Sequence, residues 1–222
     1  MKYHAIAIDG PSSSGKSTIA KIVAKKLNYL YVDTGAMYRA FTYACLKNKI
    51  DPKNEKESIK LIDKIEIDFN KENNVTLDGI DVSKEIREKE VNDNVSYIST
   101  YKDVRTHLIE AQRKIAYNHN VVMDGRDIGS YVLPFADVKI FQVAEVNERA
   151  KRRYKENLAK GIECSFEEIL ENLKKRDYID SHREYSPLKR ADDAITIDTT
   201  YMSIEEVSNN ILKIIKEKGI NI

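Results

Sequence analysis

Short apolar runs alternate with amphipathic stretches along most of the chain. Runs with the length of buried strands occur at residues 3–8, 30–32, 120–123, 138–143 and 194–197. Stretches with apolar residues at the helical period occur at residues 16–27, 34–49, 145–159, 166–183 and 204–216. Strands that alternate with helices predict βαβ units and therefore a parallel sheet. We expect Thr34 to be the N-cap of the second helix.

The segment at about residues 63–98 interrupts this alternation. It contains EIDF and then NVTLDGIDV, two short extended runs separated by Asn and Gly. These features predict a small antiparallel element inserted into the α/β core of a single domain that spans residues 1–222.

Composition narrows the class of protein. The chain has 222 residues, of which 41% are hydrophobic and 33% charged, and its formal net charge is +1. This balance is typical of a globular protein and predicts no binding to nucleic acid or to a membrane. The N-terminus lacks the pattern of a signal peptide, and no apolar run is long enough to span a membrane. The two cysteines, Cys45 and Cys164, are far apart and outside any CxxC, so we expect a reduced, cytoplasmic protein.

The sequence GPSSSGKST at residues 10–18 lies between a predicted strand and a predicted helix. Residues 10–17 fit the pattern G-x-x-x-x-G-K-[ST] of the phosphate-binding loop, in which backbone N–H groups and a helix N-terminus face an anion. In that pattern Lys16 contacts the β and γ phosphates, and the Ser17 hydroxyl contacts Mg²⁺. We therefore predict a site for a nucleoside triphosphate, formed by Gly10, Pro11, Ser12, Ser13, Ser14, Gly15, Lys16, Ser17 and Thr18.

Two features bear on the fate of the triphosphate. The tetrapeptide NKID at residues 48–51 matches the guanine-reading pattern by letters, but it ends a helical stretch, and no Asp-x-x-Gly accompanies it, which argues against a GTPase.

Phosphoryl transfer needs positioned positive charge, and arginine binds phosphate bidentately. Candidate arginines are Arg39, Arg105, Arg126, Arg149, Arg152, Arg153, Arg176 and Arg183.

Several motifs, in order and spacing, resemble the bacterial cytidylate kinases, a family of P-loop nucleoside monophosphate kinases. They are GPSSSGKST, DTGAMYRA, DGRDIG, ERAKRRYKE, RDYIDSHRE and SPLKRADDAITIDTT, and the resemblance covers essentially the whole chain. It implies a three-layer α/β fold with a five-stranded parallel sheet, a monophosphate-binding insertion at about 63–98 and a helical lid at about 147–164. It implies transfer of the γ-phosphoryl group of ATP to CMP or dCMP with Mg²⁺, and we expect a monomer.

The resemblance also implies roles for individual residues. Thr34, Arg39 and Arg126 hold the phosphate of the acceptor; Ser96, Arg105 and Asp127 face the cytosine; Arg176, Asp180 and Arg183 lie near the ribose and phosphate. In the lid, Arg149, Arg152 and Arg153 can share one helical face toward the transferred group, and with Lys16 and Arg126 they form the catalytic set. Ser17 or Thr18 contacts Mg²⁺, and we favour Ser17.

Some interpretations stay open at this stage. Asp124 is either a functional carboxylate at a strand end or a helix N-cap, and Asp180 with Arg183 is either part of the site or a surface ion pair. The four histidines show no metal-ligand spacing. Two alternatives to a cytidylate kinase are a P-loop kinase for another small acceptor, such as UMP or a sugar acid, and a nucleotide-binding regulatory module without catalysis.

Overall fold

A five-stranded parallel sheet forms the centre of the molecule, as predicted. The computed structural model describes residues 2–70, 72–159 and 161–221. The sheet has the order β2-β6-β1-β7-β8 and is built from β1 (Ala5–Asp9), β2 (Leu30–Asp33), β6 (Val121–Gly125), β7 (Val138–Val143) and β8 (Ile195–Asp198). The chain leaves the central strand β1 first toward β2 and later toward β7. The loop after β1 therefore lies where the strand order reverses, the point at which open α/β sheets bind ligands.

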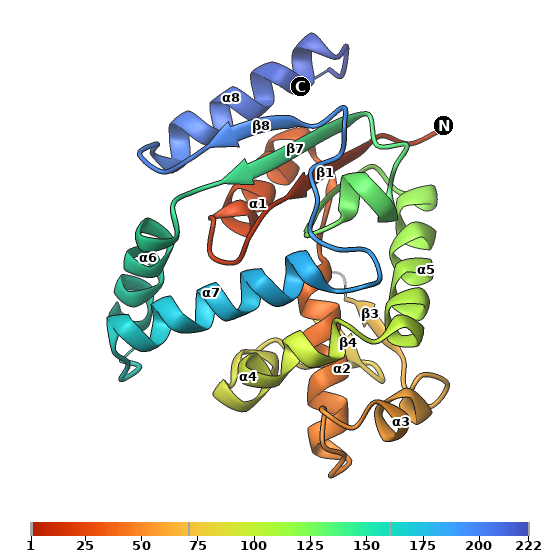
Figure 1. The fold of residues 1–222 in the computed structure, drawn as a ribbon. Coiled ribbons are helices and arrows are strands. Elements are labelled where there is room, and N and C mark those ends of the chain that lie inside the picture. The colour runs from red at the N-terminus through yellow and green to blue at the C-terminus, as the bar shows by residue number, and fades with distance from the viewer. Residues whose placement is uncertain (1, 71, 160, 222) are drawn as a thin grey trace.

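Helices cover both faces of this sheet and give three layers (Figure 1). On one face α1 (Lys16–Leu27) and α8 (Ile204–Glu217) pack against Ile6 and Ile8 of β1. On the other face α5 (Lys102–Asn118) and the short π-helical turn η3 (Ile128–Val132) pack against Ala5 and Ala7. The alternation along β1 is that of a strand buried on both sides.

The insertion lies between α2 (Thr34–Lys47) and α5, in the lower part of Figure 1. Its elements are α3 (Glu55–Ser58), η1 (Ile59–Leu61), β3 (Ile67–Phe69), β4 (Val75–Leu77), β5 (Ile80–Asp81), η2 (Glu85–Arg87) and α4 (Lys89–Ile98). The strands β3, β4 and β5 pair antiparallel, so the predicted antiparallel element is confirmed. Val75, Leu77 and Ile86 share one buried core with Met37 and Phe41 of α2, which fastens the insertion to that helix.

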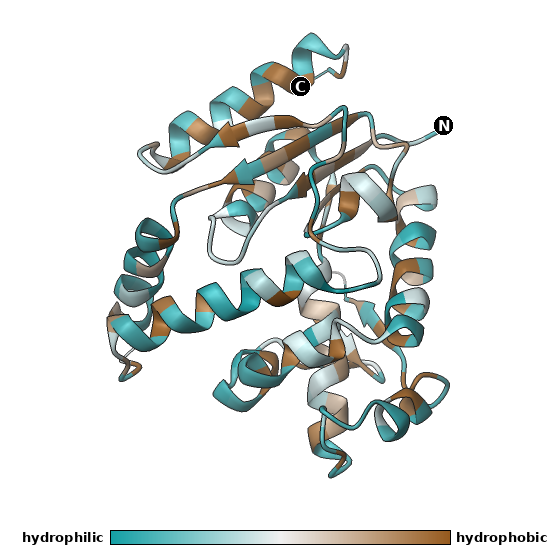
Figure 2. Ribbon diagram, viewed as in Figure 1, coloured by the Kyte–Doolittle hydropathy of each residue, from teal (hydrophilic) through white to brown (hydrophobic). Residues whose placement is uncertain are grey.

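Two helices, α6 (Val146–Ala159) and α7 (Phe166–His182), form a hairpin at the edge of the molecule (Figure 1). A small cluster around Ala150, Ile169 and Leu173 joins them, and Ser165 with Glu168 forms a capping box at the start of α7. Figure 2 shows that α6 is largely hydrophilic, in contrast to β1 and β7. The predicted lid at 147–164 lies in this hairpin, except that Lys160 is outside the described residues. Few buried apolar contacts hold α6, as in segments that open readily.

The hydrophobic pattern predicted some elements better than others. The predicted bounds of α1 and β7 agree with the structure, but the pattern predicted neither α4 nor α5. The buried face of α5 includes Arg105 and Gln112, and these polar residues interrupt its apolar period. None of the described helices is long and apolar enough to cross a membrane.

Candidate active site

Two glycines allow the loop between β1 and α1 to turn tightly. At Gly10 (φ 153°) a Cβ atom would lie 2.0 Å from the carbonyl oxygen of Gln142, so no side chain fits there. Gly15 has φ 90° and precedes the first residue of α1, Lys16. The Lys16 Nζ atom donates a hydrogen bond to the Pro11 carbonyl across the loop (3.1 Å). Loop, helix N-terminus and ammonium group thus form an anion site.

A cavity of about 840 Å³ opens beside this loop. From the loop it is lined by Ser12, Ser13, Ser14, Gly15, Lys16, Ser17 and Thr18, whereas Gly10 and Pro11 do not line it. All the residues predicted to hold the acceptor line the same cavity: Thr34, Arg39, Ser96, Arg105, Arg126, Asp127, Arg176, Asp180 and Arg183. The structure therefore gathers both candidate sets around one space.

Lys16 is the loop cation, and it is only 5% exposed. Burial, followed by the positive charge of Arg126, lowers the pKa of Lys16 to about 7. A phosphate group placed beside this lysine would favour its charged form.

Asp124 is the penultimate residue of β6 and faces the first turn of α1. Its carboxylate accepts hydrogen bonds from the Ser17 hydroxyl (2.7 Å) and from the Tyr31 hydroxyl (2.8 Å). Burial, with the nearby charge of Asp33, raises the pKa of Asp124. The N-cap interpretation of Asp124 is wrong, because the residue lies within β6 and begins no helix. Hydroxyl and carboxylate oxygens of this kind suit Mg²⁺, which takes few protein ligands beside water and phosphate oxygens.

Asp33, not Thr34, is the N-cap of α2, which corrects the prediction. The Asp33 side chain accepts from the Ala36 amide (2.8 Å), while the Thr34 hydroxyl donates to the Asp124 carbonyl (2.8 Å). Arg39 and Arg87 each lie 3.1 Å from the same Asp33 carboxylate. Burial opposes ionisation of Asp33, but the two arginines outweigh it and hold its pKa below the ordinary value. One carboxylate therefore caps α2 and orients two guanidinium groups of the cavity wall.

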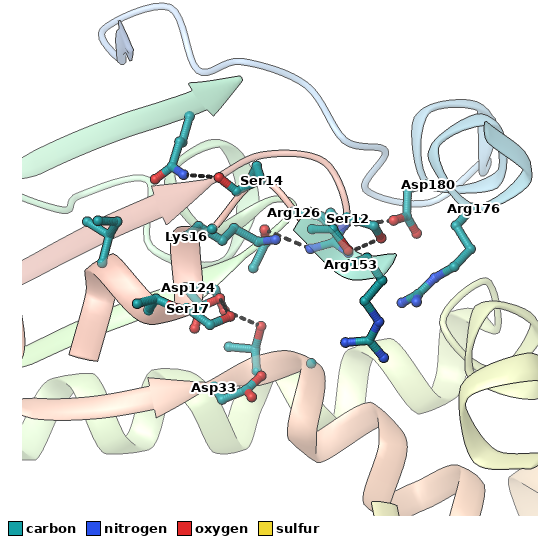
Figure 3. A pocket seen from close by; sticks show the side chains of 18 of the residues that line it. Ser12, Ser14, Lys16, Ser17, Asp33, Asp124, Arg126, Arg153, Arg176 and Asp180 are labelled. Atoms are coloured by element: carbon teal, nitrogen blue, oxygen red, sulfur yellow. Dashed lines mark hydrogen bonds and ion pairs between the residues drawn. The ribbon is translucent and has the colours of Figure 1, made fainter. Parts of the chain in front are cut away.

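Arg126 joins the loop to α7. Its Nε atom lies 2.7 Å from Asp180, and its Nη2 atom donates to the Ser12 hydroxyl (2.7 Å) (Figure 3). The guanidinium group thus reaches the loop from the end of β6.

Asp127 has buried partners on both of its carboxylate oxygens. Oδ2 accepts from Arg105 (2.5 Å) and from the Ser186 hydroxyl, and Oδ1 accepts from Arg183 (3.1 Å). The side chains of Arg105 and Arg183 are 1% and 2% exposed. Asp180 also lies 3.8 Å from Arg183, so these charges form a buried network rather than a surface ion pair. The surface interpretation of Asp180 and Arg183 is therefore wrong.

Arg153 and Arg176 extend guanidinium groups into the open part of the cavity (Figure 3). The Nε atom of Arg176 is buried and has no hydrogen-bond partner among the residues that the structure describes. Burial, followed by the charge of Arg126, lowers the pKa of Arg176 to about 10. Within the described part of the chain, the ion pair of Arg153 is with Glu156 of the same helix, at 3.3 Å. These two cations are well placed to meet an anion.

The three arginines of α6 do not share one role in the structure. Arg152 and Arg153 line the cavity, but Arg149 does not. Arg149 is 5% exposed, donates to the Ser12 carbonyl (2.8 Å) and pairs with Asp177 (2.7 Å). The expectation that all three face the transferred group is wrong for this conformation, in which Arg149 braces the phosphate-binding loop.

Among the residues at or beside the site that were not predicted are Asp9, Asp33, Arg87 and Gln142. Asp33 directly follows the predicted strand at residues 30–32, and that position was a usable signal. Arg87 lies in the insertion, and nothing in the local pattern marks it. Gln142 donates to the Ser14 carbonyl from within β7, a contact that only the sheet order reveals.

Comparisons with known proteins agree with this geometry. Residues 6–217 match the family model described as cytidylate kinase. A cytidylate kinase from Clostridioides difficile (strain 630) is 55% identical over 207 residues, 93% of this chain and 95% of that protein. A cytidylate kinase from Bacillus cereus (strain ATCC 10987 / NRS 248) is 50% identical over 217 residues, 96% of each chain. A solved structure, an uncharacterized protein from Eubacterium ventriosum ATCC 27560, has a TM-score of 0.54 at 14% identity, over 97% of this chain and 99% of that chain. This last likeness shows the fold alone.

Proposed function

The chain belongs to the cytidylate kinase family, and from this premise we infer that it transfers the γ-phosphoryl group of ATP to CMP or dCMP. It is an ATP-dependent phosphotransferase, and the products are ADP with CDP or dCDP. Family membership decides against a regulatory module without catalysis.

The donor site is the phosphate-binding loop. Its amides and Lys16 bind the β and γ phosphates, and Ser17, held by Asp124 at 2.7 Å, is the residue that would contact Mg²⁺ rather than Thr18. Bound Mg²⁺ neutralises charge that develops on the transferred group. Asp124 orients the hydroxyl, because a carboxylate acceptor fixes the direction in which Ser17 donates.

The acceptor phosphate binds among Thr34, Arg39, Arg126 and Arg176. Support comes from three guanidinium groups that line the cavity, of which Arg39 and Arg126 are oriented by Asp33 and Asp180. Arginine held in a fixed plane binds phosphate bidentately without first losing side-chain entropy. Asp180 and Arg183 lie beside this group and would contact the ribose.

The cytosine faces Ser96, Arg105 and Asp127. Cytosine presents a 4-amino donor beside the N3 acceptor, whereas uracil presents a 4-carbonyl beside N3–H. The Oδ1 atom of Asp127 accepts one hydrogen bond, from Arg183, so a second lone pair can accept from the 4-amino group. Arg105 is the donor on the same wall. A uracil carbonyl would leave two acceptors facing each other, at a penalty of about 1–3 kcal/mol.

The lid at 147–164 closes over both nucleotides and excludes water from the transferred group. Arg152 and Arg153 would approach the phosphates on closure, with Gly161 (φ 68°) as a pivot, while Arg149 positions the loop through Ser12.

The insertion at 63–98 supplies Ser96 to the acceptor site and is the monophosphate-binding part. We also propose that the protein is a monomer and that it acts in the cytoplasm, where these nucleotides occur.

One observation carries the proposal: the phosphate-binding loop and the buried Arg105–Asp127 pair line the same cavity. The test is a screen of CMP, dCMP, UMP and AMP as acceptors with ATP and Mg²⁺, in which ADP formation is coupled to a change in absorbance. CMP or dCMP should have the highest kcat/KM. A preference for UMP or AMP, or a rate independent of any acceptor, would contradict the assignment.

A further inference from the structure

Asp9 is a buried carboxylate just before the phosphate-binding loop. It is 4% exposed, it ends β1, and it does not line the cavity. Its Oδ1 atom accepts a hydrogen bond from the Ile128 amide (2.8 Å), and its Oδ2 atom accepts from the Gly129 amide (2.7 Å). The side chain of Asp9, the residue before the phosphate-binding loop, therefore holds the backbone that follows the proposed acceptor-binding residues Arg126 and Asp127.

Asp9 contacts the chain on both sides of Arg126 and Asp127. On one side, β1 and β6 pair with Asp9 opposite Gly125. On the other side, the Asp9 carboxylate binds the two amides that follow Asp127. These two contacts fix both ends of the dipeptide relative to the residue that precedes Gly10.

The surrounding packing leaves this segment little room to move. A Cβ atom at Gly125 would lie 2.7 Å from the side chains of Ile128 and Thr34. One at Gly129 would lie 3.1–3.3 Å from the Lys139 side chain. The carbonyl of Asp127 accepts hydrogen bonds from the amides of Tyr131 and Val132 in the turn η3, which also restrain the backbone of this segment. Because the segment is closely packed, a displacement of the Ile128 and Gly129 amides by a change at the Asp9 carboxylate should also displace Arg126 and Asp127.

We propose that Asp9 is a positioning residue, which sets the separation between the phosphate-binding loop and the acceptor-binding pair Arg126–Asp127 through its bonds to the Ile128 and Gly129 amides. The inference rests on the proposed function. Arg126 reaches Ser12 of the loop and Asp127 reaches Arg105 and Arg183, so both side chains depend on this placement. Phosphoryl transfer requires donor and acceptor atoms about 3–3.5 Å apart, and a shift of about 1 Å can cost roughly 10²-fold in rate.

The test is Asp9→Asn, which keeps the shape of the side chain. An amide has one acceptor oxygen, and its NH₂ group would face the second backbone N–H, so one of the two bonds is lost. We expect kcat at saturating ATP and CMP to fall roughly 10- to 100-fold. The Kd of a fluorescent ATP analogue without CMP should change by less than about 3-fold, because Asp9 makes no contact with the donor site cavity. Burial raises the pKa of Asp9 to about 7, so the assay is run at about pH 8, where the wild-type carboxylate is ionised.

Asp137→Asn is the matched control. The Asp137 carboxylate accepts from the Ala5 amide (2.9 Å) at the opposite end of β1, the same kind of bond away from the cavity. Its kcat should equal that of the wild type. If Asp9→Asn does not fold, Asp9→Glu replaces it: the charge is kept, but the longer side chain displaces the two amides, and kcat should again fall.

The outcomes separate the two claims. Failure of the wild type to phosphorylate CMP or dCMP would refute the proposed function. An active wild type with an Asp9→Asn kcat within about 2-fold of it, whatever the melting temperature, would overturn the positioning role, since a purely structural residue lowers stability alone. Loss of ATP-analogue binding in the variant would also overturn it, by assigning Asp9 to the loop only. A normal kcat for Asp9→Glu would do the same where Asp9→Asn cannot be measured.

Discussion

Replacement of Asp127 by alanine should destabilise the protein strongly, in addition to any effect on the acceptor base. The Asp127 carboxylate is the partner of Arg105 at 2.5 Å and of Arg183 at 3.1 Å, and these arginine side chains are 1% and 2% exposed. Alanine leaves both positive charges buried, and of their ion-pair partners in the described part of the chain only Asp180, 3.8 Å from Arg183, remains. Breaking a buried ion pair by removal of one partner costs about 3–5 kcal/mol.

Asparagine at position 127 should cost less, about 1–3 kcal/mol, because its remaining oxygen still accepts from one arginine. Glu57→Ala is the control: its pair with Lys60 (2.6 Å) has side chains 48% and 58% exposed, and an exposed pair contributes less than about 1 kcal/mol. For a chain of this size 1 kcal/mol corresponds to about 2–4 °C, so Asp127→Ala should lower Tm by roughly 6–20 °C.

The assay is urea unfolding of the nucleotide-free protein, followed by circular dichroism. The free energy of unfolding should fall in the order wild type, Asn, Ala, with an unchanged m-value. A loss below about 1 kcal/mol for Asp127→Ala would refute the reasoning, because it would mean that both arginines find water or another acceptor. A comparison of kcat/KM for CMP and UMP on the Asp127→Ala variant, at a temperature at which it is folded, then tests the base, because alanine has no acceptor: an unchanged ratio would show that Asp127 does not read the 4-amino group.

Three further predictions concern the donor site and the lid. Lys16→Ala should lower kcat by roughly 10²- to 10³-fold in a steady-state assay, and near-normal turnover by a folded variant would exclude this lysine from catalysis. Burial and the charge of Arg126 lower the pKa of Lys16 to about 7, so at about pH 8 this lysine is mostly neutral in the free protein. The phosphates of bound ATP should raise its pKa again, and binding of ATP should therefore take up close to one proton. Calorimetry in buffers of different ionisation enthalpy measures this uptake, which should be lost in Lys16→Met. Amide hydrogen exchange at 147–164 should slow when a bisubstrate analogue binds, and unchanged exchange would place the lid elsewhere.

Local order was largely predictable from the sequence. The phosphate-binding loop depends on glycines and hydroxyls at fixed spacing within nine residues, and its neighbours β1 and α1 follow from a short apolar run and from an apolar period of 3.6. The antiparallel element of the insertion followed from short extended runs around Asn and Gly. Each of these features is set by contacts between residues close in the chain.

The tertiary structure alone decided which charges meet. Arg105 and Arg183 are 22 and 56 residues from Asp127, and Ser12 is 114 residues from Arg126. Contacts between distant residues also explain two differences between the sequence analysis and the structure. Arg149 has the spacing of a lid arginine but donates to the Ser12 carbonyl. Arg105 is a charged residue on the buried face of α5, so the hydrophobic pattern did not predict that helix. Sequence spacing determines which side chains share a helix or a strand face. The order β2-β6-β1-β7-β8 brings distant strand ends together, and burial then selects the pairs, since an ion removed from water must find its partner there.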